Sequence, residues 1–514
     1  MLSLIVFLPA AVAVVLAALP ARLPARVFVG TWIAAALADL ALIIAAWVRL
    51  PAPAAGVGQA GPGGASGFGF EERLPWIPSA GISYHLGVDG LSLPLLAMTG
   101  VLFLACAVFA LRETRRVKAY VLLFLALQTV CLGLFAALDL ILFFLFFDLS
   151  IVFMYFVIAG WGHAERARAA ALKFFLYTFL GSLALLLGFI LLFLAAQPHT
   201  FDIVELAAAN PLAAGGAYAA LTLLAIGVGL AVKTPTVPFH TWLPPAHTEA
   251  PATGSAILAG VLLKMGTYGF VRIAMPLLPT SWRQYALVVL IVGVVSVVYG
   301  ALVALAQTNL KRMIAYTSVN HMGYVLVGVG AAGLVATGDV QARTLATTGA
   351  LVQMVSHGLI TAALFLLAGV LYDRGRSYDF DAWSGLAART PRFAALFAVA
   401  AFASLGLPGF SGFIAEFQIF TGSLPAAPVP VAVAVTGILV TAALFLVALQ
   451  RIFLGPLRTP DAPGTPRLLA DLRPSELVAI APLLALATLI GLAPRFLLDL
   501  VEPAAAAVNT LVAR

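Results

Sequence analysis

Two lysines, Lys233 and Lys264, lie in stretches that are otherwise apolar enough to cross a bilayer. The segment that contains them runs from Ala231 to Arg272 and is interrupted by prolines between the two lysines. A charged side chain at membrane depth costs about 3 kcal/mol or more, so such residues usually mark ion or proton pathways. The position of these two lysines within apolar segments therefore indicates ion or proton transport.

Two carboxylates occur in equally apolar surroundings. Asp148 lies within FFLFFDLSIVFMYF, and Glu416 follows a Gly/Pro-rich stretch in LGLPGFSGFIAEF. Each carboxylate needs a cation or a water-filled cavity as a partner. A structural ion pair between helices would meet that need for one carboxylate, but four charges, two of each sign, favour a proton relay.

Histidines and other polar residues fill the interval between Lys264 and Glu416. His321 and His357 are candidate links, because an imidazole titrates near neutral pH and can accept a proton on one nitrogen while releasing one from the other. A role limited to internal hydrogen bonding remains the alternative for each histidine. Four further residues are candidate supporting groups, since they lie between the lysines or share a helical face with a relay residue: His240, His247, Tyr268 and Gln353.

The composition decides which elements hold these residues. Hydrophobic residues make up 63% of the 514 residues and charged ones only 10%, whereas about a quarter of a soluble domain is charged. Apolar runs of about 20 residues predict membrane-spanning helices. We therefore expect one all-α polytopic membrane domain over residues 1–514, with about fourteen transmembrane helices, the last near residues 476–500.

The basic residues support this topology. By the positive-inside rule, nineteen of the 28 lysines and arginines fall at loop ends on one side and seven on the other, which leaves only Lys233 and Lys264 unassigned. This distribution places both termini outside, and the scattered charges exclude a nucleic-acid surface. The segment Pro51–Tyr84 is rich in Gly, Pro and Ala, so we expect a loosely packed loop there.

Two predicted helices are interrupted at related places. Pro235 and Pro238 follow Lys233, and Pro408 with its neighbouring glycines precedes Glu416. Broken helices at corresponding positions are typical of inverted repeats that hold an ion path at their interface. We expect two inverted five-helix repeats at 118–276 and 284–453, each with one broken helix.

The two cysteines, Cys106 and Cys131, have no metal-ligand spacing. An iron–sulfur or zinc site in this chain is therefore not expected, and any redox chemistry must belong to a partner.

Several motifs together resemble a known family. VKTPTVPFHTWLP, HTEAPATGSAILAGVLLKMGTYGFVR, LKRMIAYTSVNHMGY and LGLPGFSGFIAEF are similar to the proton-translocating antiporter-like module that complex I shares with Mrp-type sodium/proton antiporters. The resemblance covers about residues 85–455. Glu416, where other members have a lysine, resembles the subunit M branch of bacterial NADH-quinone oxidoreductase.

The resemblance implies roles and partners. It assigns Asp148 and Lys233 to a coupled acid–lysine pair, Lys264 to the central relay, His321 and His357 to the connection, and Glu416 to the terminal acid. It implies a non-catalytic proton-pumping subunit in a bacterial inner membrane beside other antiporter-like subunits, with NADH, FMN, iron–sulfur clusters and quinone on partner chains. An Mrp-type antiporter subunit and a membrane-bound hydrogenase anchor remain alternatives. Asp148 departs from the family glutamate by one methylene group, which predicts a weaker or water-mediated pairing with Lys233.

Overall fold

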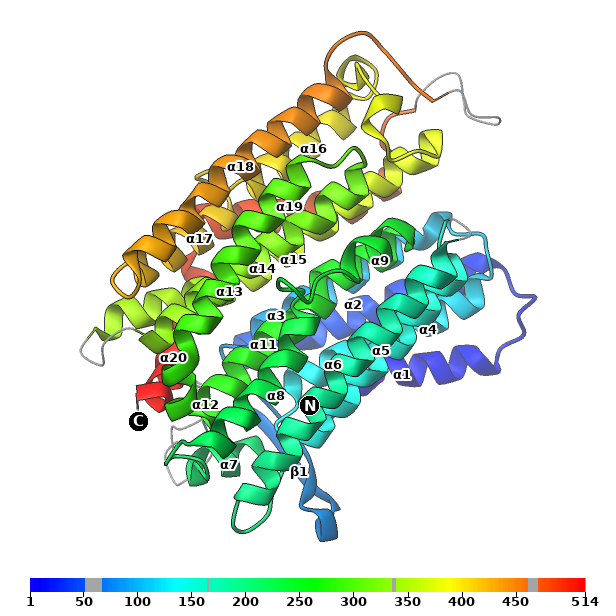
Figure 1. Ribbon diagram of the computed structural model, residues 1–514. Helices are drawn as coiled ribbons and strands as arrows, with labels where there is room; N and C mark the ends of the chain where they lie inside the picture. Colours follow the sequence, from blue (N-terminus) through cyan, green and yellow to red (C-terminus); the bar gives the residue numbers. More distant parts are fainter. Residues whose placement is uncertain (51–66, 164–165, 335–338, 461–469, 514) are drawn as a thin grey trace.

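The computed structural model describes residues 1–50, 67–163, 166–334, 339–460 and 470–513. Most of these residues lie in α-helices that run in similar directions (Figure 1). Within them, eleven helices are long and apolar enough to cross a membrane. The prediction of an all-α polytopic membrane protein is confirmed, while the total of about fourteen spans stays a prediction.

The helices of the first half carry Asp148, Lys233 and Lys264. In chain order they are α1 (Leu2–Ala18), α2 (Ala25–Arg49), α3 (Ser92–Phe109), η2 (Ala110–Arg112), α4 (Val117–Ala136), α5 (Leu140–Trp161), α6 (Ala167–Ala195), α7 (Ile203–Ala209), α8 (Ala217–Lys233), α9 (Leu243–Glu249), α10 (Ala252–Ile257), η3 (Leu258–Leu262), α11 (Leu263–Gly269), η4 (Phe270–Ala274) and α12 (Met275–Leu277). The last five segments form one continuous rod, in which η3 and η4 are π-helical turns.

The helices of the second half carry His321, His357 and Glu416. They are α13 (Pro279–Leu305), α14 (Leu310–Leu334), α15 (Val340–Gly375), η5 (Phe380–Ala382), η6 (Leu386–Ala388), α16 (Pro391–Ser404), α17 (Ser411–Ser423), α18 (Pro428–Phe453), α19 (Pro474–Leu492) and α20 (Arg495–Ala513). In each predicted repeat, 118–276 and 284–453, the fourth long helix is interrupted, after Lys233 and again between Ser404 and Ser411. The inverted relation of the segments 118–276 and 284–453 stays a prediction.

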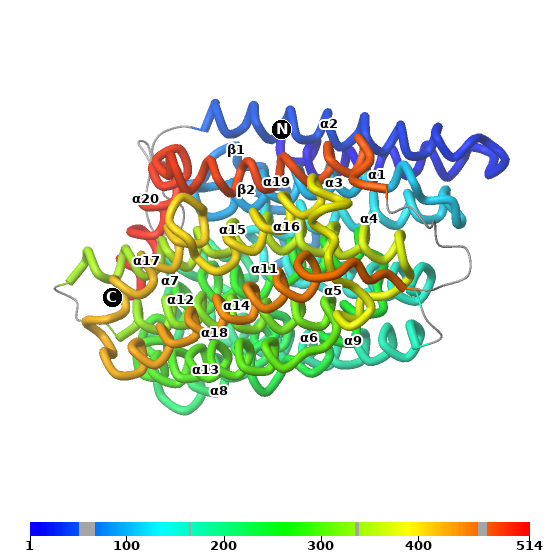
Figure 2. Tube along the Cα trace, turned by 90° about the horizontal axis from the view of Figure 1, so that it is seen from above, coloured from blue at the N-terminus to red at the C-terminus, as the bar shows by residue number. Residues whose placement is uncertain are grey.

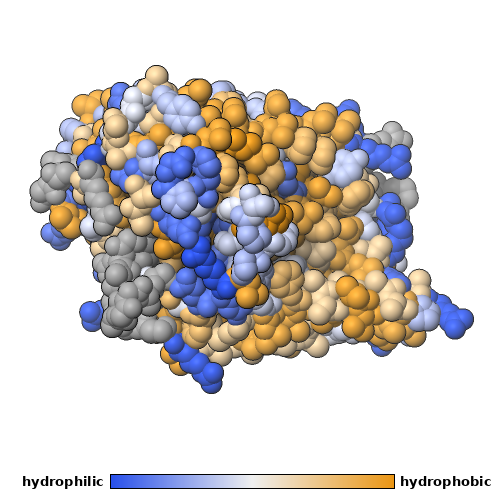
Figure 3. Space-filling model, turned by 90° about the horizontal axis from the view of Figure 1, so that it is seen from below, coloured by the Kyte–Doolittle hydropathy of each residue, from blue (hydrophilic) through white to orange (hydrophobic). Residues whose placement is uncertain are grey.

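The rod α10–α12 and helix α15 form the centre of the bundle. Figure 2 shows α1 and α2 along one side and α8 and α13 along the other, with α11 and α15 between them. Nearly all side chains of the rod and of α15 are buried, whereas α2, α6 and α13 leave many apolar side chains exposed. Exposed hydrophobic residues also cover most of the face in Figure 3, as expected of a surface in contact with lipid. The central helices are therefore shielded from lipid, and they carry Lys264 and His357.

A β-hairpin closes one end of the bundle, where the sequence predicts a loosely packed loop. Residues 51–66 lie outside the described residues, but β1 (Gly69–Ile77), η1 (Pro78–Ala80) and β2 (Ile82–Val88) form an antiparallel hairpin. The side chains of Asp139 and Asp202 cap the N-termini of α5 and α7. Asp139 also accepts a hydrogen bond from the backbone of Ser83 in β2. Residues 69–84 therefore form a regular hairpin joined to the bundle at Ser83, although most side chains of β1 stay exposed.

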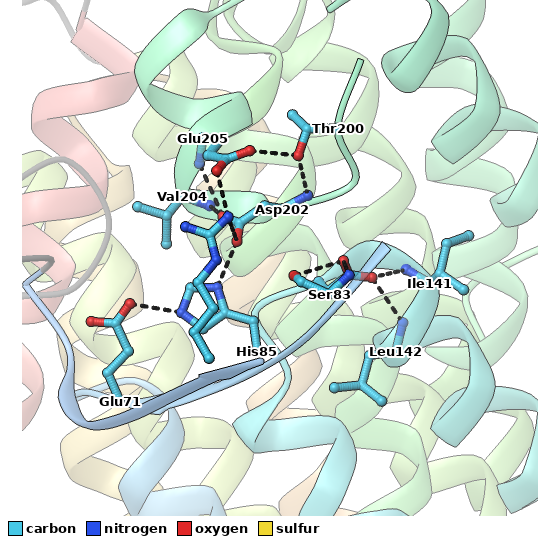
Figure 4. Close-up of polar contacts among 11 residues, drawn as sticks. Glu71, Ser83, His85, Ile141, Leu142, Thr200, Asp202, Val204 and Glu205 are labelled. Carbon is cyan, nitrogen blue, oxygen red and sulfur yellow. Dashed lines mark hydrogen bonds and ion pairs between the residues drawn. The ribbon is translucent and has the colours of Figure 1, made fainter. Parts of the chain in front are cut away.

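One histidine links the two strands to the helices (Figure 4). His85 is 1% exposed, and its Nδ1 and Nε2 each lie 2.7 Å from a carboxylate oxygen, of Asp202 and Glu71 respectively. Burial alone would lower the pKa of His85, but the hydrogen bonds and negative charges of these two carboxylates more than offset it and raise that pKa. The positive form of His85 therefore holds the hairpin against α7.

The C-terminal span near residues 476–500 is in fact two helices. α19 ends at Leu492, and Pro494 precedes the start of α20 at Arg495. A proline has no backbone N–H to continue a helix, so the chain turns there. The side of α20 that carries Leu497, Val501 and Val508 is buried, and α20 packs on α15 and α12.

Candidate proton path

Lys233 is the last residue of α8, immediately before the interruption. Its side chain is 1% exposed, and its Nζ donates a hydrogen bond of 3.0 Å to Ser150 Oγ on α5 and lies 4.7 Å from the ring centre of Phe147. Asp148 is half-buried on the same helix and lies near Ser182 of α6. Within the described residues, no ion pair joins Asp148 to Lys233. Lys233 therefore contacts a serine of α5, and the weaker or water-mediated pairing expected between Lys233 and Asp148 stays a prediction.

Lys264 lies on α11 between the two π-helical turns. Its Nζ is 2.6 Å from the carbonyl oxygen of Ala259 and 2.6 Å from Nδ1 of His357, and the lysine is fully buried. Ala259 belongs to η3, and a π-turn changes the backbone pairing of a helix and is frequent at functional sites. The structure therefore brings Lys264 and His357, 93 residues apart in sequence, into direct contact.

The second half of the path runs across α14, α15 and α17. The ring centroids of His357 and His321 are 5.3 Å apart, and Nδ1 of His321 lies 3.8 Å from Oε1 of Glu416. Gln353 Nε2 is 3.2 Å from the same histidine nitrogen, so this side chain lies beside the ring. These groups line a small buried cavity together with Ser356, Ser404 and Thr361. Its volume of about 10 Å³ is close to the minimum for one water molecule, and a single water there would bridge neighbouring groups.

The first half of the path is separated from the second by a close helix contact. α11 packs against the end of α8 at Gly266, where a Cβ atom would lie 2.4 Å from Thr234 Oγ1 and 2.7 Å from the carbonyl oxygen of Leu230. Among the described residues, no hydrogen bond joins Lys233 to Lys264. The continuous line of side-chain contacts therefore begins at Lys264 and ends at Glu416.

The remaining predicted residues lie beside this line. The imidazole of His247 is fully buried and stacks on Phe365 at 4.5 Å, and the imidazole of His240 contacts the ring of Tyr299 edge-on at 5.0 Å. Neither histidine hydrogen-bonds to a relay residue in the described part of the chain. Tyr268 shares a face with Lys264, but its hydroxyl group accepts a hydrogen bond from Arg272 Nε and donates one to the carbonyl oxygen of Phe135.

Comparison with known proteins identifies the family. Residues 137–441 match the family model described as "NADH:quinone oxidoreductase/Mrp antiporter, TM". The chain belongs to this family. It is 39% identical to NADH-quinone oxidoreductase subunit M of Rickettsia prowazekii over 434 residues, covering 84% of each chain. It is 38% identical to subunit M of Rhodobacter capsulatus, covering 98% of this chain and 96% of that one. The predicted resemblance is confirmed.

Solved structures agree with this family assignment. A chain in the structure of respiratory complex I from Thermus thermophilus with bound NADH has a TM-score of 0.86 at 28% identity, with full coverage of both chains. A chain of the Mrp complex from Dietzia sp. DQ12-45-1b has a TM-score of 0.83 at 24% identity, covering 100% and 99% of the two chains, which shows the same fold. The long helices and their order are thus those of the family.

Sequence reasoning missed several buried polar residues of this family member. Arg272, Lys311 and Arg343 were assigned to loop ends, yet they are only 1%, 0% and 4% exposed. Lys233 and Lys264 are therefore not the only buried cations. Ser150, two residues after Asp148, was also missed, because a lone serine in an apolar helix gives no signal until its neighbour across the bundle is known.

Proposed function

We propose that this chain is a proton-translocating membrane subunit of a bacterial NADH-quinone oxidoreductase. The observation that carries the proposal is the buried line of contacts from Lys264 through His357 and His321 to Glu416. Burying a line of ionisable groups in an apolar bundle costs free energy, and such groups usually mark ion or proton pathways. The relatives named subunit M support the same assignment.

In the proposed mechanism, Lys233 alternates between the Ser150 contact seen in the structure and an ion pair with Asp148 on the same helix as Ser150. Separation of the pair leaves a buried ammonium group without its counter-charge, which drives its proton toward Lys264. Lys264 then transfers a proton to Nδ1 of His357, since the two nitrogens are 2.6 Å apart. His321 and Glu416 complete the path, with water in the shared cavity bridging the longer steps.

The energy for transport comes from outside this chain. Moving one proton charge against about 100 mV requires about 2.3 kcal/mol. We infer that NADH, FMN, iron–sulfur clusters and quinone act on partner subunits, and that neighbouring antiporter-like subunits in the bacterial inner membrane transmit the drive. We infer from the distribution of basic residues that both termini of this chain lie outside.

The test is proton pumping by the reconstituted complex with Lys264→Ala or Glu416→Ala. We expect both variants to lose most of their proton pumping at a given quinone reductase rate. Lys118→Ala is a matched control, because Lys118 donates hydrogen bonds to two carbonyl oxygens of residues 17 and 19, away from the path. Full pumping in both path variants would refute the assignment.

A second candidate is a subunit of an Mrp-type sodium/proton antiporter. The family description names both groups of proteins, and the fold of the Dietzia Mrp chain is the same. Identification of the chains that co-purify with this protein separates the two, because redox subunits support the oxidoreductase and other small membrane chains support the antiporter. A membrane-bound hydrogenase complex would be recognised in the same measurement.

A further inference from the structure

A buried arginine lies beyond Lys264 on the same helical rod. Lys264, Tyr268 and Arg272 follow one another at intervals of four residues, so they share one face of the rod. Arg272 Nη2 lies 2.5 Å from Oδ1 of Asp89, and both side chains are 0% exposed. Arg272 Nε also donates a hydrogen bond of 2.9 Å to Tyr268. The polar face of the rod therefore continues from the central lysine toward the hairpin end of the bundle.

The surroundings of this ion pair hold it rigidly. The Oδ1 atom of Asp89 accepts hydrogen bonds from the backbone N–H groups of Leu91 and Ser92 at the start of α3. The guanidinium carbon of Arg272 lies 5.2 Å from the ring centre of Phe68 in the segment that enters the hairpin. The rings of Tyr268 and Phe135 meet edge-on at 5.3 Å. Aromatic rings therefore pack around the polar line at the place where it would otherwise reach the hairpin end.

An arginine at this position has a specific chemical consequence. A lysine or histidine can release a proton to its neighbour, but a guanidinium group stays protonated in proteins and cannot pass a proton on. A buried permanent cation also repels any further positive charge that approaches it. The line from Lys264 therefore stops at Arg272.

We propose that Arg272 and Asp89 close the hairpin end of the first predicted repeat to protons, so that Lys264 exchanges its proton sideways with His357. This inference rests on the proposed function, because it concerns the direction of the same transfer. Arg272 is then a specificity-determining residue that does not itself carry the transported proton. A purely structural pair that fastens the β2–α3 turn to the rod is the competing explanation.

The variant Arg272→Lys separates the two explanations. It keeps a positive charge within reach of Asp89. A purely structural role therefore predicts that membranes with this variant leak protons no faster than membranes with the native complex. A lysine can release its proton, so the proposed barrier predicts a passive proton leak. The assay reconstitutes the whole complex in liposomes and follows an internal pH dye after an imposed pH jump, without NADH. We expect a several-fold faster leak, and a native leak rate in an assembled variant would overturn the proposal.

A second variant keeps the proposal testable if Arg272→Lys does not assemble. The double substitution Arg272→Gln with Asp89→Asn replaces the charges with a neutral amide pair that can still hydrogen-bond. We expect it to leak as well, because the permanent charge is gone, whereas native tightness would overturn the proposal. Arg374→Lys is the matched control, because Arg374 forms an ion pair of 2.6 Å with Glu476 of α19, whose side chain is 1% exposed. We expect liposomes with this control variant to show the native proton leak rate.

A combination with Lys264→Ala distinguishes this inference from the proposed function. If the leak of Arg272→Lys passes through Lys264, adding Lys264→Ala returns the leak to the native rate. A leak that persists in the combined variant would show that Arg272 does not seal this path and would overturn the inference. Normal pumping by Lys264→Ala alone would instead refute the proposed function, whatever the leak rate.

Discussion

Replacing Gly266 with alanine tests the contact between the interrupted helix α8 and the rod that carries Lys264. A Cβ atom at this position would lie 2.4 Å from Thr234 Oγ1, 2.7 Å from the carbonyl oxygen of Leu230 and 2.8 Å from the backbone nitrogen of Thr234. Two of these three atoms belong to the backbone of α8 and its end, so rotation of a side chain cannot relieve the clash. The rod must move away from α8.

The magnitude follows from two opposing effects. Overpacking a well-packed interior costs about 1–3 kcal/mol, and the better helix propensity of alanine returns at most about 1 kcal/mol. We therefore expect a net loss of up to about 2 kcal/mol in the free energy of unfolding. Because the shift separates the end of α8 from α11, we also expect slower proton transfer between Lys233 and Lys264, measured as fewer protons pumped per quinone reduced.

The assay compares Gly266→Ala with a matched glycine on α8. Gly227 has open space where its Cβ would be, with nothing within 4 Å, so Gly227→Ala should be neutral or slightly stabilising. The detergent-purified complex is heated, and the fraction of this chain that stays soluble is measured at each temperature. Equal stability and equal pumping of the two variants would refute the packing argument.

Three further predictions concern other parts of the molecule. His85→Gln should destabilise the hairpin most at low pH, because the pKa of His85 is raised in the folded state. The stability that His85 contributes is fully present below the pKa of the unfolded chain, about 6.5. It is lost as the pH rises through the pKa of the folded state. Hydrogen exchange of residues 69–88, corrected for intrinsic rates, measures the loss of hairpin stability in this variant. A loss of stability that grows with rising pH would contradict the prediction. Asp148→Glu should retain pumping, since the longer side chain brings the carboxylate nearer to Lys233, whereas Asp148→Asn should reduce it; indifference to the amide would show that the acid does not control the lysine. Glu476→Gln should cost about 1–3 kcal/mol, because it removes the carboxylate shared by Arg374 and Arg112, although Arg112 keeps its ion pair with Asp373. In the same thermal assay, Arg495→Gln should change the stability of the chain little, because the ion pair between Arg495 and Asp499 is exposed.

The sequence predicted the fold class and the identity of the chemical groups because both depend on local composition. Apolar runs predict membrane helices wherever they occur, and prolines interrupt a helix whatever surrounds it, so the breaks after Lys233 and before Glu416 were visible without a structure. The intramembrane charges stood out for the same reason, since each one costs free energy in an apolar segment.

The partners of those charges were decided only by the tertiary structure. The contact of Lys264 with His357 depends on how the rod crosses α15, and the choice of Ser150 over Asp148 depends on the rotation of α5 against α8. Arg272 looked like a loop residue because it follows an apolar run, yet the fold buries it against Asp89 from a distant turn. Composition determines that a buried charge must find a partner, but only the packing of helices far apart in sequence determines which atom that partner is.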